Sequence, residues 1–307
     1  MIICCGEALI DMLPRTTTAG EDAFAPYAGG AVFNTALALG RLGLDTSFFT
    51  GLSSDMFGDI LREALTASGV DHSPCATLDL NTTLAFVRLV NGQASYAFFD
   101  ENTAGRMITE EHLPDLGDDV EALHFGAISL IPDPCGATYE SLMRREHASR
   151  VISLDPNIRP SFITDTAKHR ARIDRMIAMS DIVKMSDEDL EWFGQPDMET
   201  AARTWLAQGP SLVVFTRGAK GAIGFTADHT VEVDGVPVTV ADTVGAGDTF
   251  NAGILASLKR DNLLTKEAMK TLSADAIGNA LRLGAKAAAV TVSRPGANPP
   301  WASEIGF

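Results

Sequence analysis

The residues whose types and spacing best suit chemistry lie in segment 241–252, which reads A-D-T-V-G-A-G-D-T-F-N-A. Gly245, Ala246 and Gly247 form a glycine-rich turn before a segment with helical periodicity, and Asp248 follows them. Such a turn presents free backbone N–H groups and the positive end of the helix dipole, which together bind phosphate. A carboxylate beside this anion hole can accept a proton from an attacking hydroxyl. The alternative is a helix cap, and the residues by themselves favour neither interpretation.

Composition and charge exclude several classes of protein. The 307 residues include 40 acidic and 24 basic ones, giving a net charge of −16, and 46% are hydrophobic. Such a chain can bury a sizeable core and repels nucleic-acid phosphates, so we expect neither a disordered protein nor a nucleic-acid binder. No apolar run approaches about 20 residues, the length of a membrane span. The cysteines at 4, 5, 75 and 135 form no C-x-x-C pair and no signal peptide is visible, which predicts a cytoplasmic protein with reduced thiols and no membrane partner.

Alternating strands and helices must position the glycine-rich turn. Short apolar runs, typical of buried strands, alternate with amphipathic segments, typical of helices. This pattern predicts a parallel sheet with helices on both faces, a Rossmann-like three-layer α/β/α sandwich, in a single domain over 1–307. The expected strands are 2–5, 47–50, 122–125, 151–154, 182–185 and 212–215, with a further β-like run at 236–240. The expected helices are 31–42, 57–68, 138–148, 168–180, 198–207, 247–259 and 275–289.

Two segments interrupt the alternation. Residues 82–100 contain two β-rich runs separated by Asn91-Gly92, a dipeptide typical of a hairpin turn, and residues 11–28 lack helical periodicity. Together they predict a small β-sheet lid, built from about 11–28 and 82–104, that projects from the main body. The alternative is a hairpin at the edge of the main sheet.

Four motifs, in order along nearly the whole chain, resemble those of the ribokinase-like carbohydrate kinases. D-T-V-G-A-G-D at 242–248 is similar to the C-terminal signature of that family, and G-G-A-V-F-N at 29–34 to its sugar-binding motif. G-E-A-L-I-D at 6–11 and T-R-G-A-K-G at 216–221 are the other two. Three segments together most resemble bacterial fructokinases: G-E-A-L-I-D at 6–11, F-F-D-E-N-T-A-G at 98–105 and D-P-N-I-R-P at 155–160.

The resemblance implies a role for each matching residue. Asp248 would be the catalytic base, and Gly245, Ala246 and Gly247 would form the anion hole for the γ-phosphate of ATP. Taken alone, Asp11 would be interpreted as a strand-end turn residue and Asn34 as a helix cap. The implied sugar contacts are Asp11, Gly29, Gly30, Asn34, Phe98 and Arg159, and the implied nucleotide contacts are Lys184, Thr216, Gly218, Gly221 and Asn279.

The resemblance also implies Mg²⁺, bound with ATP, and a site for K⁺. Many relatives carry N-x-x-E after a buried strand, where this chain has Ser186 and Asp189. We therefore expect Asp189 to organise hydrated Mg²⁺ through water. Asp242 and the backbone of Val244 lie where relatives organise K⁺, and Pro300 stands where some relatives carry a ligating serine. Activation by K⁺ is accordingly expected to be modest.

These motifs predict an ATP-dependent sugar kinase, with D-fructose converted to fructose 6-phosphate and a homodimer formed through the lid. The alternatives are a 2-keto-3-deoxygluconate kinase, a nucleoside kinase and a catalytically silent sugar-binding relative. Ketodeoxygluconate is an anion, and none of Arg88, Arg106 and Arg159 is expected to clamp a carboxylate, which favours neutral fructose. The chain has no G-x-x-x-x-G-K-[ST] motif and no G-x-G-x-x-G after its first strand, which excludes P-loop kinases and dinucleotide oxidoreductases.

Overall fold

The computed structural model describes the backbone of residues 1–90 and 93–307, and the side chains outside 87–96. The hairpin turn predicted at Asn91-Gly92 lies outside the described residues. The main sheet has the strand order β14-β13-β12-β11-β10-β9-β1-β4, parallel from β4 to β12 and antiparallel at β13 and β14. Its strands are β1 (Ile2–Cys5), β4 (Thr46–Phe49), β9 (Ala122–Gly126), β10 (Val151–Asp155), β11 (Ile182–Ser186), β12 (Leu212–Thr216), β13 (Ala222–Phe225) and β14 (Thr230–Val233).

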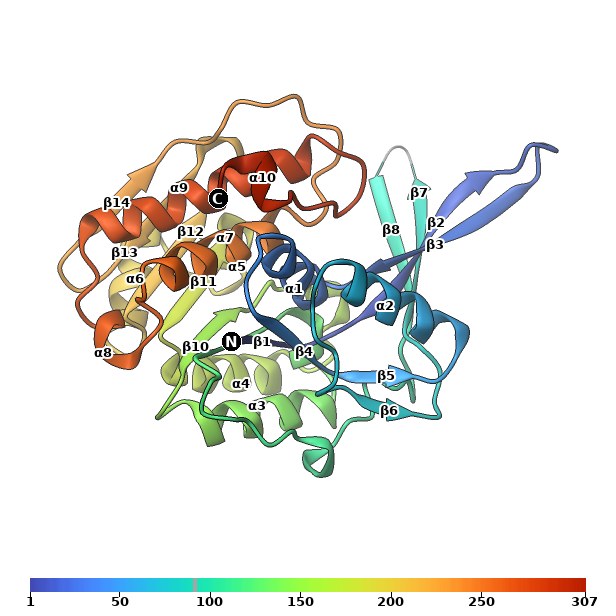
Figure 1. Ribbon diagram of the computed structural model, residues 1–307, viewed down its shortest axis with the longest axis horizontal. Helices are drawn as coiled ribbons and strands as arrows, with labels where there is room; N and C mark the ends of the chain where they lie inside the picture. The colour runs from blue at the N-terminus through green and yellow to red at the C-terminus, as the bar shows by residue number, and fades with distance from the viewer. Residues whose placement is uncertain (91–92) are drawn as a thin grey trace.

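Helices cover both faces of this sheet (Figure 1). Alternate residues of the strands join two separate apolar clusters, one on each face, which explains why the parallel strands are apolar runs rather than alternating ones. The α/β/α sandwich is therefore confirmed. One face carries α1 (Ala31–Arg41), α2 (Met56–Ala67), α7 (Ala246–Arg260) and α9 (Ala274–Val292); the other carries α3 (Cys135–Glu146), α4 (Thr166–Met179), α5 (Asp187–Trp192) and α6 (Met198–Leu206).

Short elements complete the chain. The strands β5 (Gly51–Ser53) and β6 (Ala76–Leu78) pair with each other beside α2. The remaining helical turns are α8 (Lys266–Met269), α10 (Ala302–Ile305), η1 (Glu110–His112), η2 (Ala127–Leu130), η3 (Pro160–Phe162) and η4 (Gly218–Lys220). Among the described helices, none combines the length and the apolar character that a membrane span needs.

The predicted strand at 236–240 is wrong. This segment follows β14 as an irregular connection, and the side chains of Val236, Val238 and Val240 are substantially exposed. Pro237 in the middle of this segment has no N–H group to donate to the free edge of β14, and residues 236–240 are not paired with any described strand. The valines instead line a cavity described below.

Four strands form a sheet of their own that projects from the main body (Figure 1). Their order is β3-β2-β7-β8, with β2 (Leu9–Thr16), β3 (Asp22–Gly29), β7 (Leu84–Val90) and β8 (Gln93–Phe99). The register aligns Asp11 with Ala85, and Ala85 with Phe98. Because side chains alternate between the two faces of a sheet, Asp11 and Phe98 share one face. We call this sheet the lid.

Candidate active site

The glycine-rich turn ends where α7 begins, at Ala246. Gly245 adopts a left-handed conformation, with a φ of 78°, and a Cβ placed on it would lie 2.8 Å from the Cβ of Ala297. Only glycine fits there without strain. Asp248 lies in the first turn of α7 and is 7% exposed. The structure thus places a buried carboxylate at the start of a fifteen-residue helix, where the N–H of Ala246 donates to the Thr243 carbonyl at 3.3 Å and those of Gly247 and Asp248 have no partner among the described residues.

Asp248 contacts the helix that carries the predicted sugar motif. The Nδ2 atom of Asn34 donates to Oδ2 of Asp248 at 2.9 Å, and the hydroxyl of Thr35 donates to the backbone carbonyl of Asp248 at 3.2 Å. Burial is the main cause that raises the pKa of Asp248 to about 7; the Asn34 hydrogen bond and the Lys184 charge oppose the rise, and the nearby Asp155 carboxylate adds to it. A carboxylate with this pKa can take up a proton at neutral pH.

A buried cation lies next to this carboxylate. The Nζ atom of Lys184, on β11, donates to Oδ2 of Asp155 at 3.1 Å, and Asn251 of α7 donates to the same oxygen at 2.7 Å. Burial disfavours the charge of Lys184, but attraction to Asp155, Asp189 and Asp248 outweighs burial and raises its pKa. A Cβ placed on Gly247 would lie 3.0 Å from Nζ, so the ammonium group faces the anion hole.

The predicted sugar residues gather where the lid meets α1. A Cβ on Gly29 would lie 2.4 Å from Oδ2 of Asp11, so this glycine makes room for the carboxylate. Burial raises the pKa of Asp11 to about 6. The Oδ1 atom of Asn34 is buried and has no hydrogen-bond partner among the described residues. Buried polar atoms are nearly always paired, so Oδ1 is an acceptor available to a bound hydroxyl.

Glu7 holds this region together, and the sequence interpretation missed it. Its Oε1 accepts from the backbone N–H of Ala31 at 2.8 Å, at the start of α1, and its Oε2 accepts from the N–H of Ser129 at 3.3 Å. Gly30 has a φ of 115°, and a Cβ there would lie 2.7 Å from the carbonyl oxygen of Glu7. The position of Glu7 directly after a buried strand was the available signal, since strand ends in α/β sheets form binding sites.

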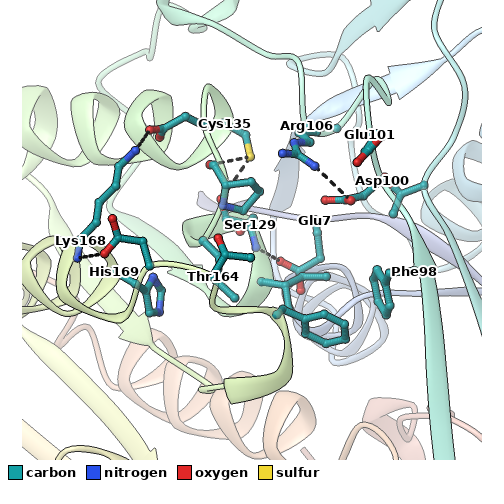
Figure 2. Close-up of a pocket in the computed structure, with 18 of the residues that line it drawn as sticks. Glu7, Phe98, Asp100, Glu101, Arg106, Ser129, Cys135, Thr164, Lys168 and His169 are labelled. Carbon is teal, nitrogen blue, oxygen red and sulfur yellow. Dashed lines mark hydrogen bonds and ion pairs between the residues drawn. The ribbon is translucent and has the colours of Figure 1, made fainter.

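A cavity of about 460 Å³ opens between the lid and the loops that follow β9 and β10 (Figure 2). Phe98 lines it, and its ring lies 4.6 Å from that of Phe162, measured between centroids. Arg106 lines it as well and pairs with Asp100 at 3.1 Å. Arg159 does not line the cavity: its side chain is exposed and donates to the carbonyl of Ile158 at 3.0 Å. The structure therefore brings Phe98 to the cavity and leaves Arg159 outside it.

A second cavity, of about 590 Å³, lies on the other side of the glycine-rich turn. Its walls are mainly apolar, apart from backbone groups and two threonines, as suits a planar aromatic ring. Asn279 lies outside this cavity, exposed at the surface, where it accepts a hydrogen bond from Arg282 at 2.8 Å. The lining residues include the predicted Thr216, Gly218, Gly221, Ala246 and Gly247, together with Val236, Val238, Val240, Phe250, Ala285, Ala288, Ala289 and Val292.

Asn279 is misplaced in the sequence interpretation for a geometric reason. The α9 residues that reach the cavity begin at Ala285, six positions later. Six residues correspond to roughly 9 Å along a helix. About 1.7 turns of α9 therefore separate Asn279 from the nearest α9 residue of the cavity wall.

The predicted metal residues are already engaged in hydrogen bonds. Oδ1 of Asp189 accepts from the N–H of Ile158 at 2.7 Å, and Oδ2 accepts from the N–H and the hydroxyl of Ser186, both at 2.8 Å. Asp189 thus ties the loop after β10 to the start of α5. Asp242 accepts from the N–H of Val244 at 3.0 Å and from that of Gly296 at 2.9 Å. In the described part of the chain, no three His, Cys, Asp or Glu side chains cluster as metal ligands would.

Comparison with known families shows which family the whole chain matches. The family described as "pfkB family carbohydrate kinase" matches residues 1–304. This chain belongs to the pfkB family of carbohydrate kinases. Among curated relatives, the pfkB kinase described here is 68% identical over 280 residues to the fructokinase of Rhizobium leguminosarum bv. trifolii, covering 91% of this chain and 86% of the relative. The family resemblance predicted from the four motifs is confirmed.

Solved structures agree with this assignment. The crystal structure of fructokinase with bound ATP from Xylella fastidiosa matches this pfkB kinase with a TM-score of 0.85 at 29% identity, over 99% of this chain and 96% of that one. A Vibrio cholerae O395 fructokinase in a fructose-, ADP- and calcium-bound form matches with a TM-score of 0.84 at 25% identity, over 96% and 94% of the two chains. The chain is therefore a phosphotransferase of the sugar-kinase type.

Proposed function

We propose that this pfkB kinase transfers the γ-phosphate of ATP to the 6-hydroxyl of D-fructose. The observation that carries the proposal is the buried Asp248 carboxylate, with a pKa of about 7, at the start of α7. The 68% identity to a bacterial fructokinase supports fructose as the sugar.

The proposed reaction needs one proton acceptor and one set of positive groups. Asp248 takes the proton of the sugar hydroxyl as its oxygen attacks the γ-phosphorus. The bond from that phosphorus to the bridging oxygen breaks, and ADP leaves with the electron pair. The N–H groups of Ala246 and Gly247, at the start of α7, would stabilise the charge on the transferring group. Closure of the lid would exclude water from this step.

Lys184 would add a full positive charge to the anion hole. Its hydrogen bond to Asp155 uses one of its three N–H donors. The ammonium group lies close to the place that a side chain on Gly247 would fill, and this glycine has none. A phosphate oxygen at Gly247 would thus contact both backbone N–H groups and the ammonium group. The Asp155–Asn251 pair would hold Lys184 in place when the nucleotide leaves.

ATP would lie in the apolar cavity beside Thr216 and Gly218, with Mg²⁺ arriving bound to its phosphates. Both Asp189 oxygens already accept hydrogen bonds, which disfavours direct ligation of Mg²⁺ by this carboxylate. Contact between Asp189 and hydrated Mg²⁺ through water remains a prediction. Asp242 and the Val244 carbonyl remain the proposed K⁺ contacts, with modest activation expected. A cytoplasmic location is likewise a proposal, supported by the free thiols of the four cysteines.

We also propose that two copies associate through the outer face of the lid. Phe24, Phe86 and Phe99 pack edge to face there, with ring centroids 5.1 and 5.5 Å apart, yet Phe24 is 48% and Phe99 59% exposed. A cluster of exposed aromatic rings is typical of an interface. Phe99→Glu should convert a dimer to a monomer in light scattering after size exclusion. A wild type that is monomeric at micromolar concentration would refute this.

A sugar panel tests the proposed activity. The purified kinase is given Mg²⁺–ATP and fructose, ketodeoxygluconate, ribose or adenosine, and formation of ADP is measured by a coupled assay. We expect the highest kcat/KM with fructose and a product phosphorylated at O6 by ³¹P NMR. A preference for the acid sugar or for adenosine would overturn the fructose assignment. Sugar binding by calorimetry without any phosphotransfer would identify a silent relative.

A further inference from the structure

The proposed reaction does not use Glu7, a buried carboxylate that follows β1 and is 9% exposed. Its Oε1 accepts from the N–H of Ala31 at 2.8 Å, and its Oε2 accepts from the N–H of Ser129 at 3.3 Å (Figure 2). Burial raises the pKa of Glu7, and hydrogen bonds, those from Ser129 and Ala31 among them, oppose the rise. Because both oxygens accept from N–H groups, the ionised form suits this place. Glu7 thus joins two segments that are far apart in the chain.

The first of these segments is the start of α1. Gly30, the residue before α1, has no side chain that could cap the helix. Glu7 acts as the cap from outside the helix, because its Oε1 accepts from the N–H of Val32 at 3.4 Å as well as from the residue before it. The same helix carries Asn34, whose Nδ2 donates to Asp248. The position of Asn34 therefore depends on where Glu7 holds the first turn of α1.

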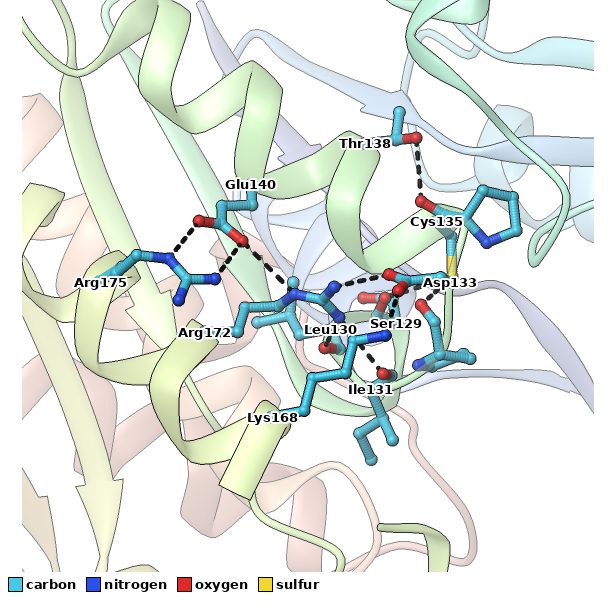
Figure 3. Close-up of polar contacts among 12 residues, drawn as sticks. Ser129, Leu130, Ile131, Asp133, Cys135, Thr138, Glu140, Lys168, Arg172 and Arg175 are labelled. Atoms are coloured by element: carbon cyan, nitrogen blue, oxygen red, sulfur yellow. Dashed lines mark hydrogen bonds and ion pairs between the residues drawn. The ribbon is translucent and has the colours of Figure 1, made fainter. Parts of the chain in front are cut away.

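The second segment is the loop that follows β9. Its far end is fixed to α4, where Arg172 donates to the carbonyls of Leu130 and Ile131 at 2.9 and 3.2 Å (Figure 3). Its near end is fixed by Glu7, through the N–H of Ser129. The loop is thus held from both sides, by a guanidinium group on its carbonyls and by a carboxylate on its N–H group.

Both segments border the proposed base. Ala31 of α1 and Ala127 of the loop line the same small cavity as Asp248. Ala127 has a φ of 58°, a left-handed conformation that is strained in a residue with a Cβ. Contacts nearby must hold it, and the hydrogen bond between Glu7 and Ser129 lies two residues away. Besides burial, the main cause, the negative charge of Glu7 helps to raise the pKa of Asp248.

We propose that Glu7 is a positioning residue for phosphotransfer, whose ionised carboxylate holds the start of α1 and the loop after β9 together and thereby places Asn34 and Asp248. This proposal rests on the role of Asp248 as the base, proposed above. The charged groups that act on Asp248 include Asp155 on β10, Lys184 on β11 and Glu7 after β1. Removal of the Glu7 charge should lower the pKa of Asp248 and leave the ion pair of Asp155 intact.

Two variants separate the charge of Glu7 from its reach. Glu7→Gln keeps the length and removes the charge, and its NH₂ group cannot accept from one of the two N–H groups. Glu7→Asp keeps the charge but is one CH₂ group shorter. Both should lower kcat/KM for the sugar at pH 8 at least about tenfold, because small displacements in an active site are costly. The KM for ATP should stay within about twofold, because Glu7 does not line the cavity proposed for the nucleotide.

The pH profile distinguishes positioning at Asp248 from a merely structural role. In Glu7→Gln the acid limb of kcat/KM should move to lower pH by at least about half a unit, whereas in Glu7→Asp it should stay in place. A limb that does not move in Glu7→Gln, or a kcat/KM of Glu7→Asp within about twofold of the wild type, would overturn the proposal. Circular dichroism checks the fold, and Glu7→Asp decides alone if Glu7→Gln does not fold.

Asp181→Asn is the matched structural control. Asp181 is also a buried carboxylate, and it accepts from the N–H of Ile152 at 2.8 Å, but it precedes β11 and so lies at the opposite edge of the sheet from Glu7. This variant should lower the melting temperature, because Lys266 loses its partner, and leave kcat/KM and the acid limb unchanged. Changes equal to those of Glu7→Gln would contradict a specific role for Glu7.

The choice of sugar keeps this test separate from the proposed function. All assays use the sugar that the wild type phosphorylates fastest in the panel above, so failure with fructose alone refutes the fructose assignment and not the role of Glu7. A wild-type profile without an acid limb refutes Asp248 as the base. The loss of kcat/KM in Glu7→Asp at pH 8 then still decides whether Glu7 positions the site.

Discussion

Replacing the proposed base by an amide, Asp248→Asn, should abolish turnover and leave the site intact. The amide keeps the shape of the side chain and its contact with Asn34, whose unpaired Oδ1 can accept from the new NH₂ group. Loss of general base catalysis costs about 10²–10⁴-fold in kcat. Binding of fructose and of ATP, measured by calorimetry, should change less than about threefold, because neither ligand binds through the proton that Asp248 accepts.

The structure also sets the pH dependence. The wild type needs the ionised carboxylate, so kcat/KM should fall about tenfold for each pH unit below 7 and level off above it. The residual activity of Asp248→Asn should lack this dependence. Asp275→Asn is the matched control, because Asp275 lies in the first turn of the long helix α9 but is exposed. Wild-type turnover in Asp248→Asn, or the same pH profile, would refute the role of Asp248 as the base.

Stability provides an independent measure of the same burial. The pKa of Asp248 rises from an ordinary 3.8 to about 7 on folding, which corresponds to roughly 4 kcal/mol at 1.4 kcal/mol for each pKa unit. Because the folded pKa is the higher one, this stabilisation is present below pH 4 and is lost as the pH rises through 7. Denaturant unfolding at pH 8 should therefore show Asp248→Asn to be more stable than the wild type, by up to that amount. An unfolding free energy lowered by the substitution would contradict the burial argument.

Further substitutions probe the proposed anion hole and the proposed nucleotide cavity. Gly247→Val should raise the KM for ATP and lower kcat, each at least about tenfold in steady-state assays, because its side chain would displace Lys184 and block the anion hole; unchanged constants would place the anion hole elsewhere. Lys184→Met should lower kcat about 10²–10³-fold and also lower the melting temperature, since Asp155 would stay buried without its cation; normal turnover would show that phosphate does not need this charge. Asn279→Ala should change the KM for ATP less than about twofold, because Asn279 lies outside the cavity proposed to bind the nucleotide; a tenfold rise would place ATP closer to Asn279 on α9.

Local patterns in the sequence were enough to predict the layers of the fold and the glycine-rich turn before α7. The strand runs are apolar on both faces because helices cover both, and this is visible in the chain itself. The Gly245–Gly247 turn before a helix, followed by Asp248, is also a local signal, since a positive φ and a close backbone approach require glycine. A family resemblance then linked Asp248 to the sugar motif at Gly30 and Asn34.

Only the tertiary structure decided how these groups act on one another. The pKa of Asp248 depends on burial and on Asn34, 214 positions earlier in the chain, and the orientation of Lys184 depends on Asp155 and Asn251. The same limit explains where the structure differs: residues 236–240 have the composition of a strand but do not pair with the free edge of β14, and Asn279 lies about 1.7 helical turns from the cavity. Residue type and spacing determine which chemistry a side chain can perform, because these are local properties. Burial, charge and cavity walls come from segments far apart in the chain, and folding alone brings them together.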